Sequence, residues 1–335
     1  MTNKYVYIFK KYKQVKNFMF WLLLIAIVFV ILIVVYNSVP WAENKVLFYP
    51  SKKFHWKPDV SYQDVYIDID NPNIVYNTRP KKECKRRYIN GWHFNNYPGS
   101  NTVMYCHGNT LNISHRSYIV DICCQFELNL FIFDYRGFGK SSGKPSKRYV
   151  RKDGETAYKF LTQHCGIEGE NIIIWGESLG GYCATWVASR FPSRSLILLC
   201  SFSGLDDAIT YYFDSGLGQS LASLYSSMAS MRYDIMPNRK YIKRVKCPVA
   251  IMHSKEDDII PYECAKILYK NVSHDSKVLI TIKGGHSSPL IDKEQLNKLF
   301  MFCDISLPFY DKSCDINGML EELRTVAEKH HNFID

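Results

Sequence analysis

Cysteine is sparse in this chain, and the spacings typical of disulfide or zinc frameworks are missing. Only 11 of the 335 residues are Cys, an odd number, and no C-x-x-C pair occurs. This composition excludes a disulfide-stapled miniprotein, and without zinc-ligand spacing we expect no metal site. Heptads, collagen triplets and fixed-period repeats are also missing, which excludes coiled-coil, collagen and solenoid architectures.

Apolar and aromatic residues, by contrast, are abundant. The chain is 47% hydrophobic and 15% aromatic, with 42 Lys and Arg against 32 Asp and Glu and a formal net charge of +10. Disordered chains carry far less apolar material, so we expect a folded protein. Residues 1–57 hold nine Lys and a single acid, Glu43, which leaves only +2 for residues 58–335. A region with so little net charge is a poor candidate for binding the phosphate backbone of a nucleic acid.

One uninterrupted apolar segment, residues 18–36, contains no charge, Gly or Pro. As a helix it would be roughly 28 Å long, close to the ~30 Å hydrocarbon core of a bilayer, with Trp21 and Tyr36 at the interfaces. We predict an uncleaved transmembrane anchor in the lipid bilayer, between a basic tail (1–17) and a juxtamembrane segment (37–57). A cleaved signal peptide is the alternative, disfavoured because the apolar run is too long and no small-x-small cleavage site follows at once.

The charges beside the anchor predict its orientation. Five Lys and no acid precede it, whereas the next twenty residues hold three Lys and Glu43. The positive-inside rule then predicts a type II single-pass protein with its body on the lumenal or extracellular side, in an endomembrane such as the endoplasmic reticulum. Two N-x-S triplets, at Asn112 and Asn271, are possible glycosylation sites. Asn271 is the better candidate, because Asn112 falls in a loop assigned below to the active site.

From about residue 58, strand-like and helix-like segments alternate along the chain. The predicted strands are short and rich in β-branched and aromatic residues: 65–69, 102–106, 129–133, 172–175, 196–199, 249–253 and 278–282. The predicted helices include 119–123, 157–161 and 179–191, with a last amphipathic one near 319–326. This order predicts a single α/β domain over 58–335, with a mostly parallel central sheet flanked by helices.

Two segments break the alternation. Residues 202–246, rich in Ser, Tyr and Met, would fit a small cap that lines an acyl-chain pocket, or else ordinary packing. Residues 70–90 carry a cluster of three Lys and two Arg. We interpret this cluster as a solvated hairpin loop, with contact to anionic headgroups as the alternative.

The segment 172–175 leads directly into a G-x-S-x-G motif at residues 176–180, and a helix-like segment follows. On a sharp strand-to-helix turn the serine is lifted out of the sheet, and small neighbours let the chain pass close to itself. Ser178 is therefore the predicted nucleophile. In this architecture the backbone N–H of the next residue, Leu179, donates to the oxyanion near a helix N-terminus that favours negative charge.

A serine nucleophile needs a base and an orienting acid, and here the acid precedes the base along the chain. We predict His286 as the base, because it lies in a Gly-Gly-His-Ser turn just after a predicted strand. His274 precedes that strand, and the last two His lie in a polar tail. The acid lies in Glu-Asp-Asp at residues 256–258, and spacing alone leaves these three carboxylates as alternatives.

Taken in order, these segments resemble the α/β-hydrolase superfamily, specifically its membrane-anchored serine hydrolases with an α/β-hydrolase domain. The matching segments cover most of residues 45–290: FYPS (48–51), HGNTLNISHR (107–116), FDYRGFGKSSGKPS (133–146), GESLGG (176–181), HSKEDDIIP (253–261) and GGH (284–286). The resemblance implies the α/β-hydrolase fold. The family's H-G-x-x-D-x-x-V-P pattern implies Asp257 as the acid, although Ser254 replaces the usual Gly.

The resemblance also implies a second oxyanion donor in the loop that starts at residue 107. Asn109 is the best candidate, although Leu111 stands where the family commonly has Gly. The same pattern implies structural roles beside the nucleophile for Asp134, Arg136 and Gly137.

The function implied is hydrolysis of an ester or thioester through an acyl-enzyme, without a metal or organic cofactor. The expected substrates are acyl lipids, such as lysophospholipids or monoacylglycerols, with acylated proteins as the alternative should the body be cytosolic. Two other readings are a peptidase, weakened by the lack of a gating domain, and a catalytically inactive membrane binding protein.

Overall fold

The protein is described here from a computed structural model, which covers residues 19–21, 23, 24, 27, 45, 47–81, 86–212 and 236–305. The chain divides into two units, residues 1–48 and 49–335. Most of the predicted anchor lies outside the described residues, and the few of its residues that are described are helical. Within the described part of the chain, no helix has the length and apolar character needed to span a bilayer.

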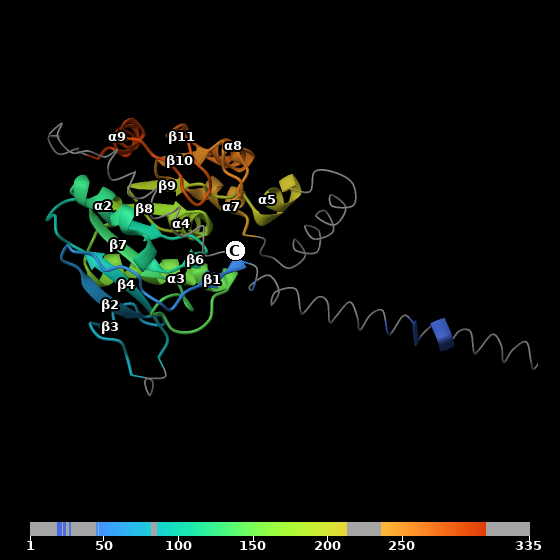
Figure 1. Cartoon of the computed structure of the whole chain (residues 1–335), viewed down its shortest axis with the longest axis horizontal. Helices are drawn as coiled ribbons and strands as arrows, with labels where there is room; N and C mark the ends of the chain where they lie inside the picture. The colour runs from blue at the N-terminus through green and yellow to red at the C-terminus, as the bar shows by residue number, and fades with distance from the viewer. Residues whose placement is uncertain are drawn as a thin grey trace, which may run out of the picture. The chain divides into compact units, whose positions relative to one another are not determined.

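The second unit is built around a nine-stranded sheet in the order β11-β10-β9-β8-β5-β7-β4-β2-β3 (Figure 1). In chain order these strands are β2 (Gln63–Asp68), β3 (Val75–Tyr76), β4 (Tyr88–Phe94), β5 (Thr102–Cys106), β7 (Asn129–Asp134), β8 (Ile172–Glu177), β9 (Ser195–Leu199), β10 (Val249–Ser254) and β11 (Lys277–Ile282). The six strands from β11 to β7 pair in parallel, whereas β4, β2 and β3 join antiparallel. The predicted mostly parallel sheet is confirmed.

All seven predicted strands form, with ends shifted by at most two residues. Sequence reasoning missed two strands of this sheet, the two-residue β3 and the longer β4. The Asn, Gly and His residues of β4 do not read as strand, although all seven of its residues are buried. Gly91 is required there, because a Cβ at this position would come within 2.6 Å of the Phe131 ring. The predicted hairpin loop at 70–90 therefore contains β3 and the start of β4.

Helices pack on both faces of the sheet, and their bounds are α2 (Ser117–Gln125), α3 (Lys147–Lys159), α4 (Leu179–Ala188), α8 (Tyr262–Asn271) and α9 (Lys293–Phe302). Helices α2 and α9 share one apolar core, in which the Phe126 and Phe300 rings are 4.4 Å apart. Helices α3 and α4 touch each other at Gly154, where a Cβ would overlap the Cys183 sulfur. The sequence predicted α2, α3 and α4 but not α8 or α9, and the helix predicted near 319–326 lies outside the described residues.

The predicted cap is described only at its ends. It begins with α5 (Leu205–Tyr212) and closes with α7 (Asn238–Tyr241) and a 3-10 turn at Ile242–Arg244. Residues 213–235 lie outside the described part.

The compact unit starts before the predicted domain boundary at residue 58. Strand β1 (Tyr49–Pro50) pairs in parallel with β6 (Thr110–Leu111), and the Tyr49 N–H donates to the Asn109 carbonyl at 2.9 Å. Residues 49–57, assigned from sequence to a juxtamembrane segment, are therefore part of the hydrolase-like unit.

His93 on β4 is a buried imidazole in an aromatic setting. Its side chain lies edge-on to the rings of Phe131 and Phe160, and its Nε2 has no hydrogen-bond partner among the described residues. Burial, with a smaller contribution from His164, lowers its pKa to about 4.

We expect His93 to make folding weaker in acid. Between about pH 6.5 and pH 4 the unfolded chain is protonated at this residue while the folded protein is not, so stability falls as the pH drops, by about 3 kcal/mol. Chemical denaturation at neutral pH and near pH 4 should show a smaller loss for His93→Phe than for wild type. The exposed His55→Phe serves as the control, and an equal loss in His93→Phe would contradict this assignment.

Candidate active site

Ser178 lies on a sharp turn between β8 and α4, with φ 51° and ψ −116°. This left-handed backbone is costly for any residue other than Gly and persists only where the surroundings impose it. Here they do so through tight packing: a Cβ on Gly180 would overlap the Cys106 carbonyl, and one on Gly176 would lie 2.6 Å from Gly181 Cα. The G-x-S-x-G spacing thus fixes where the hydroxyl points.

The structure brings the predicted nucleophile, base and acid together at the carboxyl ends of β8, β11 and β10. His286 Nε2 lies 2.9 Å from Ser178 Oγ. On the other side of the ring, His286 Nδ1 lies 2.8 Å and 3.0 Å from the two carboxylate oxygens of Asp257. Through this alignment the serine proton can pass to an imidazole whose orientation and tautomer are set by the carboxylate.

The three adjacent carboxylates of residues 256–258 each have a separate partner. Asp257 contacts the imidazole, whereas Glu256 accepts the Gly284 N–H at 2.9 Å and Asp258 accepts the His286 N–H at 3.2 Å. Spacing alone left these alternatives open. The geometry places Asp257 beside the ring, as the resemblance implied, and gives its two neighbours the task of holding the histidine loop.

Several donors keep Asp257 ionised, although its side chain has no exposed surface. Burial raises the pKa of this carboxyl, but hydrogen bonds from His253 and His286, helped by the Ile260 N–H at 2.7 Å, outweigh it and hold the pKa well below the usual range. His253 Nε2 lies 3.3 Å from Asp257 and 2.9 Å from the Ile260 carbonyl. Sequence reasoning missed this role of His253. The residue is the first of the HSKEDDIIP segment, four positions before Asp257, and that spacing could have indicated the contact.

Among the described residues, donor atoms of Cys200, His253 and Asp257 lie within 4.8 Å of one another, a grouping compatible with a metal ion. Its chemistry does not favour one. Burial raises the pKa of the Cys200 thiol well above its usual value, which disfavours the thiolate that metals bind. The other two members are occupied in supporting His286.

The loop predicted to supply oxyanion donors lies against the nucleophile turn. A Cβ on Gly108 would be 3.7 Å from Ser178 Cβ. Leu179 is the first residue of α4, where backbone N–H groups have no acceptor within the helix. Leu111 has φ 64°, which explains why Gly is common at this position, and the loop accommodates Leu with that backbone strain.

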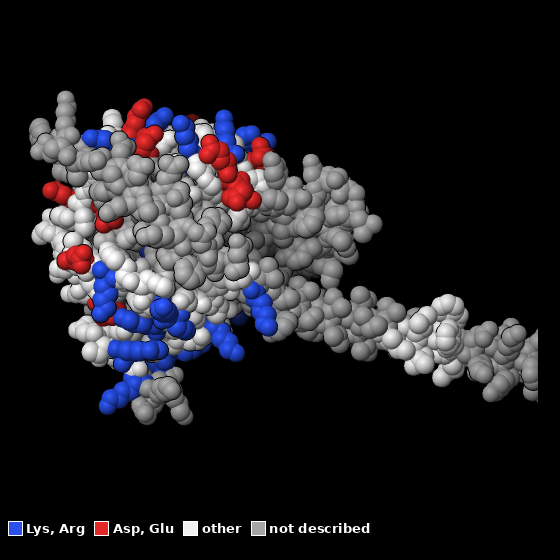
Figure 2. Space-filling view, viewed as in Figure 1, with Lys and Arg blue, Asp and Glu red and all other residues white. Residues whose placement is uncertain are grey.

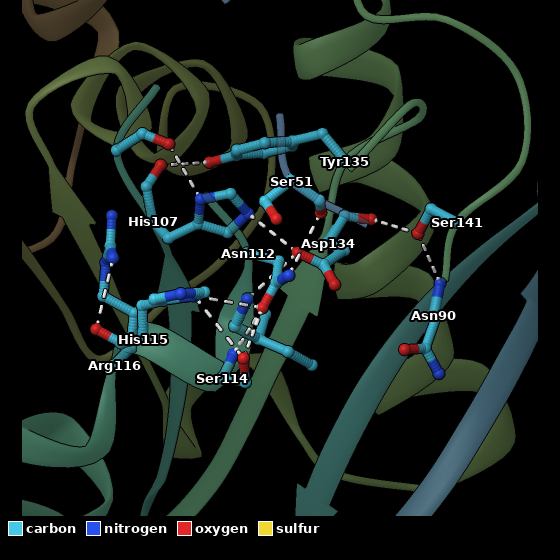
Figure 3. Close-up of polar contacts among 12 residues, drawn as sticks. Ser51, Asn90, His107, Asn112, Ser114, His115, Arg116, Asp134, Tyr135 and Ser141 are labelled. Carbon is cyan, nitrogen blue, oxygen red and sulfur yellow. Dashed lines mark hydrogen bonds and ion pairs between the residues drawn. The ribbon is translucent and has the colours of Figure 1, made fainter. Parts of the chain in front are cut away.

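A buried polar network supports the same loop from behind (Figure 3). His107 Nε2 lies 3.4 Å from Asp134 Oδ1, and the Ile113 N–H donates to that oxygen at 3.1 Å. The Tyr135 hydroxyl donates to the His107 carbonyl at 3.0 Å. His107 is fully buried in this network. It therefore packs the loop, and Asp134 has the structural role that the resemblance implied.

The structure corrects the suggestion of a glycan on Asn112. This side chain is fully buried, and its Nδ2 donates to the carbonyls of Ser51 and Lys53 at 3.0 and 2.7 Å (Figure 3). A sugar on that nitrogen would remove these bonds and find no space. Asn271 is the last residue of α8 and is half-buried, and its glycosylation stays a prediction.

Glu177, the variable residue of the motif, is the centre of a charged network that sequence reasoning missed. Its Oε2 accepts hydrogen bonds from Tyr105, Tyr118 and Arg116 at 2.7, 2.8 and 3.0 Å. Burial raises its pKa, but Arg116 and the two hydroxyls outweigh burial and lower it. Arg116 also donates to the Thr110 carbonyl at 3.4 Å, so this network ties the nucleophile turn to the loop opposite.

A serine on a strand-to-helix turn, with His and Asp at neighbouring strand ends of a mostly parallel sheet, defines the class of the α/β hydrolases. The family described as "alpha/beta hydrolase fold" matches residues 101–213. The chain is therefore similar to the α/β hydrolases over this segment and has the α/β-hydrolase fold.

Its similar proteins agree with this assignment. "Alpha/beta hydrolase domain-containing protein 17C" of Xenopus tropicalis is 30% identical over 219 residues, 63% of this chain and 64% of that protein. Human "Alpha/beta hydrolase domain-containing protein 17B" is 27% identical over 202 residues, 60% and 65%. The chain thus spans about 64% of the length of these curated relatives.

Solved structures share the fold at low sequence identity. The Pyrococcus furiosus esterase Pf2001 has a TM-score of 0.56 at 18% identity, covering 77% of this chain and 97% of the esterase. DcsB, in a complex with its substrate analogue, has a TM-score of 0.52 at 15% identity, covering 73% and 99%.

Proposed function

We propose that this protein is a serine hydrolase that cleaves carboxylic ester or thioester bonds. The observation that carries the proposal is the continuous alignment of hydroxyl, imidazole and ionised carboxylate at Ser178, His286 and Asp257. Ser178 Oγ attacks the substrate carbonyl while its proton passes to His286 Nε2, and Asp257 stabilises the resulting imidazolium. The proton then goes to the leaving alcohol or thiol, which leaves an acyl-enzyme that water hydrolyses by the same route.

The backbone N–H groups of Leu179 and Asn109 are the proposed oxyanion donors. The loop supported by Asp134 and the first turn of α4 lie on either side of Ser178, which supports this assignment. One such donor contributes roughly 100- to 1,000-fold in rate. No step of this mechanism requires a metal or an organic cofactor.

The proposed substrates are acyl lipids, with lysophospholipids and monoacylglycerols as the class and acylated proteins as the alternative. The apolar segment 18–36 supports this choice, because a bilayer anchor would keep the enzyme at the surface where such substrates reside. The charges around that segment favour a lumenal body, which a glycan on Asn271 would report. A binding protein without activity is the competing proposal, and the intact alignment at Ser178 argues against it.

The test is covalent capture of the nucleophile. A fluorophosphonate probe should label the full-length protein, with the modified peptide mapped to Ser178, because only an activated serine reacts at a useful rate. Ser201→Ala is a matched control, since this neighbouring hydroxyl donates to the Ser178 carbonyl at 3.0 Å but lies outside the proton path. Absence of labelling, or labelling at another residue, would sink the enzyme proposal in favour of the binding protein.

A further inference from the structure

A cleft lies between α3 and the β2–β4 end of the sheet, and none of the predicted catalytic residues lines it. This cleft has a volume of about 360 Å³. Five cationic side chains line it, namely Arg87, Arg136, Arg148, Lys152 and Lys159, together with the carboxylates of Asp70 and Glu155. Its chemistry therefore depends on which of these charges are already paired.

Both carboxylates of the cleft are engaged. Asp70 accepts from Arg87 at 3.1 Å. Glu155 accepts from Trp186 Nε1 at 2.6 Å and lies 3.5 Å from Arg190. Neither carboxylate forms an ion pair with Arg148, Lys152 or Lys159.

The cations divide into paired and unpaired groups. Arg136 is buried and bound to Asp153 at 2.6 Å. Arg148, Lys152 and Lys159 make no ion pair or side-chain hydrogen bond with the described residues. Three uncompensated positive charges therefore border one concave surface.

Helix stability gives no reason for this arrangement. Arg148 lies in the first turn of α3, which follows the Ser146 cap and contains no acidic residue. The helix dipole disfavours a cation at this end of the helix. Arg148 and Lys152 are also a like-charged pair four residues apart, which destabilises an isolated helix. Both side chains are exposed, so packing does not require them either.

We propose that this cleft binds a phosphate-bearing anion, such as the phosphomonoester or pyrophosphate group of a small molecule or a lipid headgroup. Three uncompensated cations match the two or three negative charges of such a group. The Arg148 guanidinium can hold two phosphate oxygens at once, while Lys152 and Lys159 act as point charges. The volume is at the lower end of the range for small-ligand sites, and a lining that is mostly polar suits a headgroup better than an acyl chain.

The wider surface agrees with this proposal. In Figure 2, Lys and Arg side chains gather on the visible face around β2, β3 and α3. At the β10, β11 and α8 end, by contrast, Asp and Glu side chains are interspersed with Lys and Arg. An anion approaching from solution would be attracted to the side that contains the cleft.

Calorimetric titration of the full-length protein tests the site with two probes, inorganic pyrophosphate for a free phosphate compound and inositol 1,4-bisphosphate for a lipid headgroup. We expect wild type to bind at least one of them, and the double variant Arg148→Gln/Lys152→Gln to bind it at least about tenfold more weakly. Lys159→Gln should weaken it about fivefold. Whichever probe binds more tightly identifies the source of the phosphate.

The matched control is Lys243→Gln/Arg244→Gln, which removes the same two charges from exposed positions outside the cleft. This control should bind the probe as tightly as wild type does, because charges outside the cleft make no direct contact with the bound phosphate. The proposal fails if neither probe binds wild type, if the cleft variants bind as tightly as wild type, or if the control loses as much affinity.

Discussion

Replacing Ser178 with Ala is expected to lower kcat for ester hydrolysis about a million-fold while leaving the fold intact. The hydroxyl supplies the attacking atom, and no neighbouring group in the site can take its place: the Ser201 hydroxyl is directed to the Ser178 carbonyl. Hydrolysis of a short-chain nitrophenyl ester by the purified full-length protein measures the loss. Ser201→Ala should retain most of the activity, and a Ser178→Ala enzyme within tenfold of wild type would contradict the mechanism.

Asp257→Asn is expected to lower kcat/KM by about ten thousand-fold. The carboxylate accepts the Nδ1–H of His286, and an amide can present its NH2 group to the ring instead, which favours the wrong tautomer. Because hydrogen bonds hold the pKa of Asp257 well below its usual range, the carboxylate stays charged at every pH at which an esterase assay is run. The wild-type rate should therefore show no separate loss from protonation of Asp257 in mild acid.

The adjacent Asp258 provides the matched control for that experiment. Its carboxylate accepts the backbone N–H of His286 at 3.2 Å and lies outside the proton path. We expect Asp258→Asn to reduce activity far less than Asp257→Asn, by about tenfold or less, since the amide oxygen of Asn can still accept the His286 N–H. A larger loss for Asp258→Asn than for Asp257→Asn would reverse the assignment of the two carboxylates.

The central sheet and the nucleophile were predictable because their signals are local. Buried parallel strands are continuous apolar runs, and the turn at Ser178 needs small residues at fixed spacing. Strand β4 escaped prediction because Gly91 accommodates a Phe131 ring contributed by β7, forty residues along the chain. A contact of that kind has no local signature.

A catalytic residue could be predicted from the sequence only where its position relative to the strands and to the nucleophile identified it. His286 followed from its place after a strand, whereas Asp257 required the family pattern, because its two neighbours have the same chemistry. Glu177 had no signal at all, since the motif allows any residue at that position and its partners are distant in sequence. At Asn112 the local signal misled: a glycosylation triplet proved to be an internal support for the loop.

The pairing of β1 with β6 has a practical consequence for anyone preparing this protein. A fragment cut at residue 58, where the sequence suggests that the domain begins, would keep every proposed catalytic side chain. It would lose β1, whose Tyr49 N–H donates to the Asn109 carbonyl. It would also lose the carbonyls of Ser51 and Lys53, which accept hydrogen bonds from the Asn112 side chain. Such a truncation would keep the proposed catalytic side chains but remove contacts that support the loop beside Ser178. A fragment that contains the catalytic unit should therefore begin no later than Tyr49.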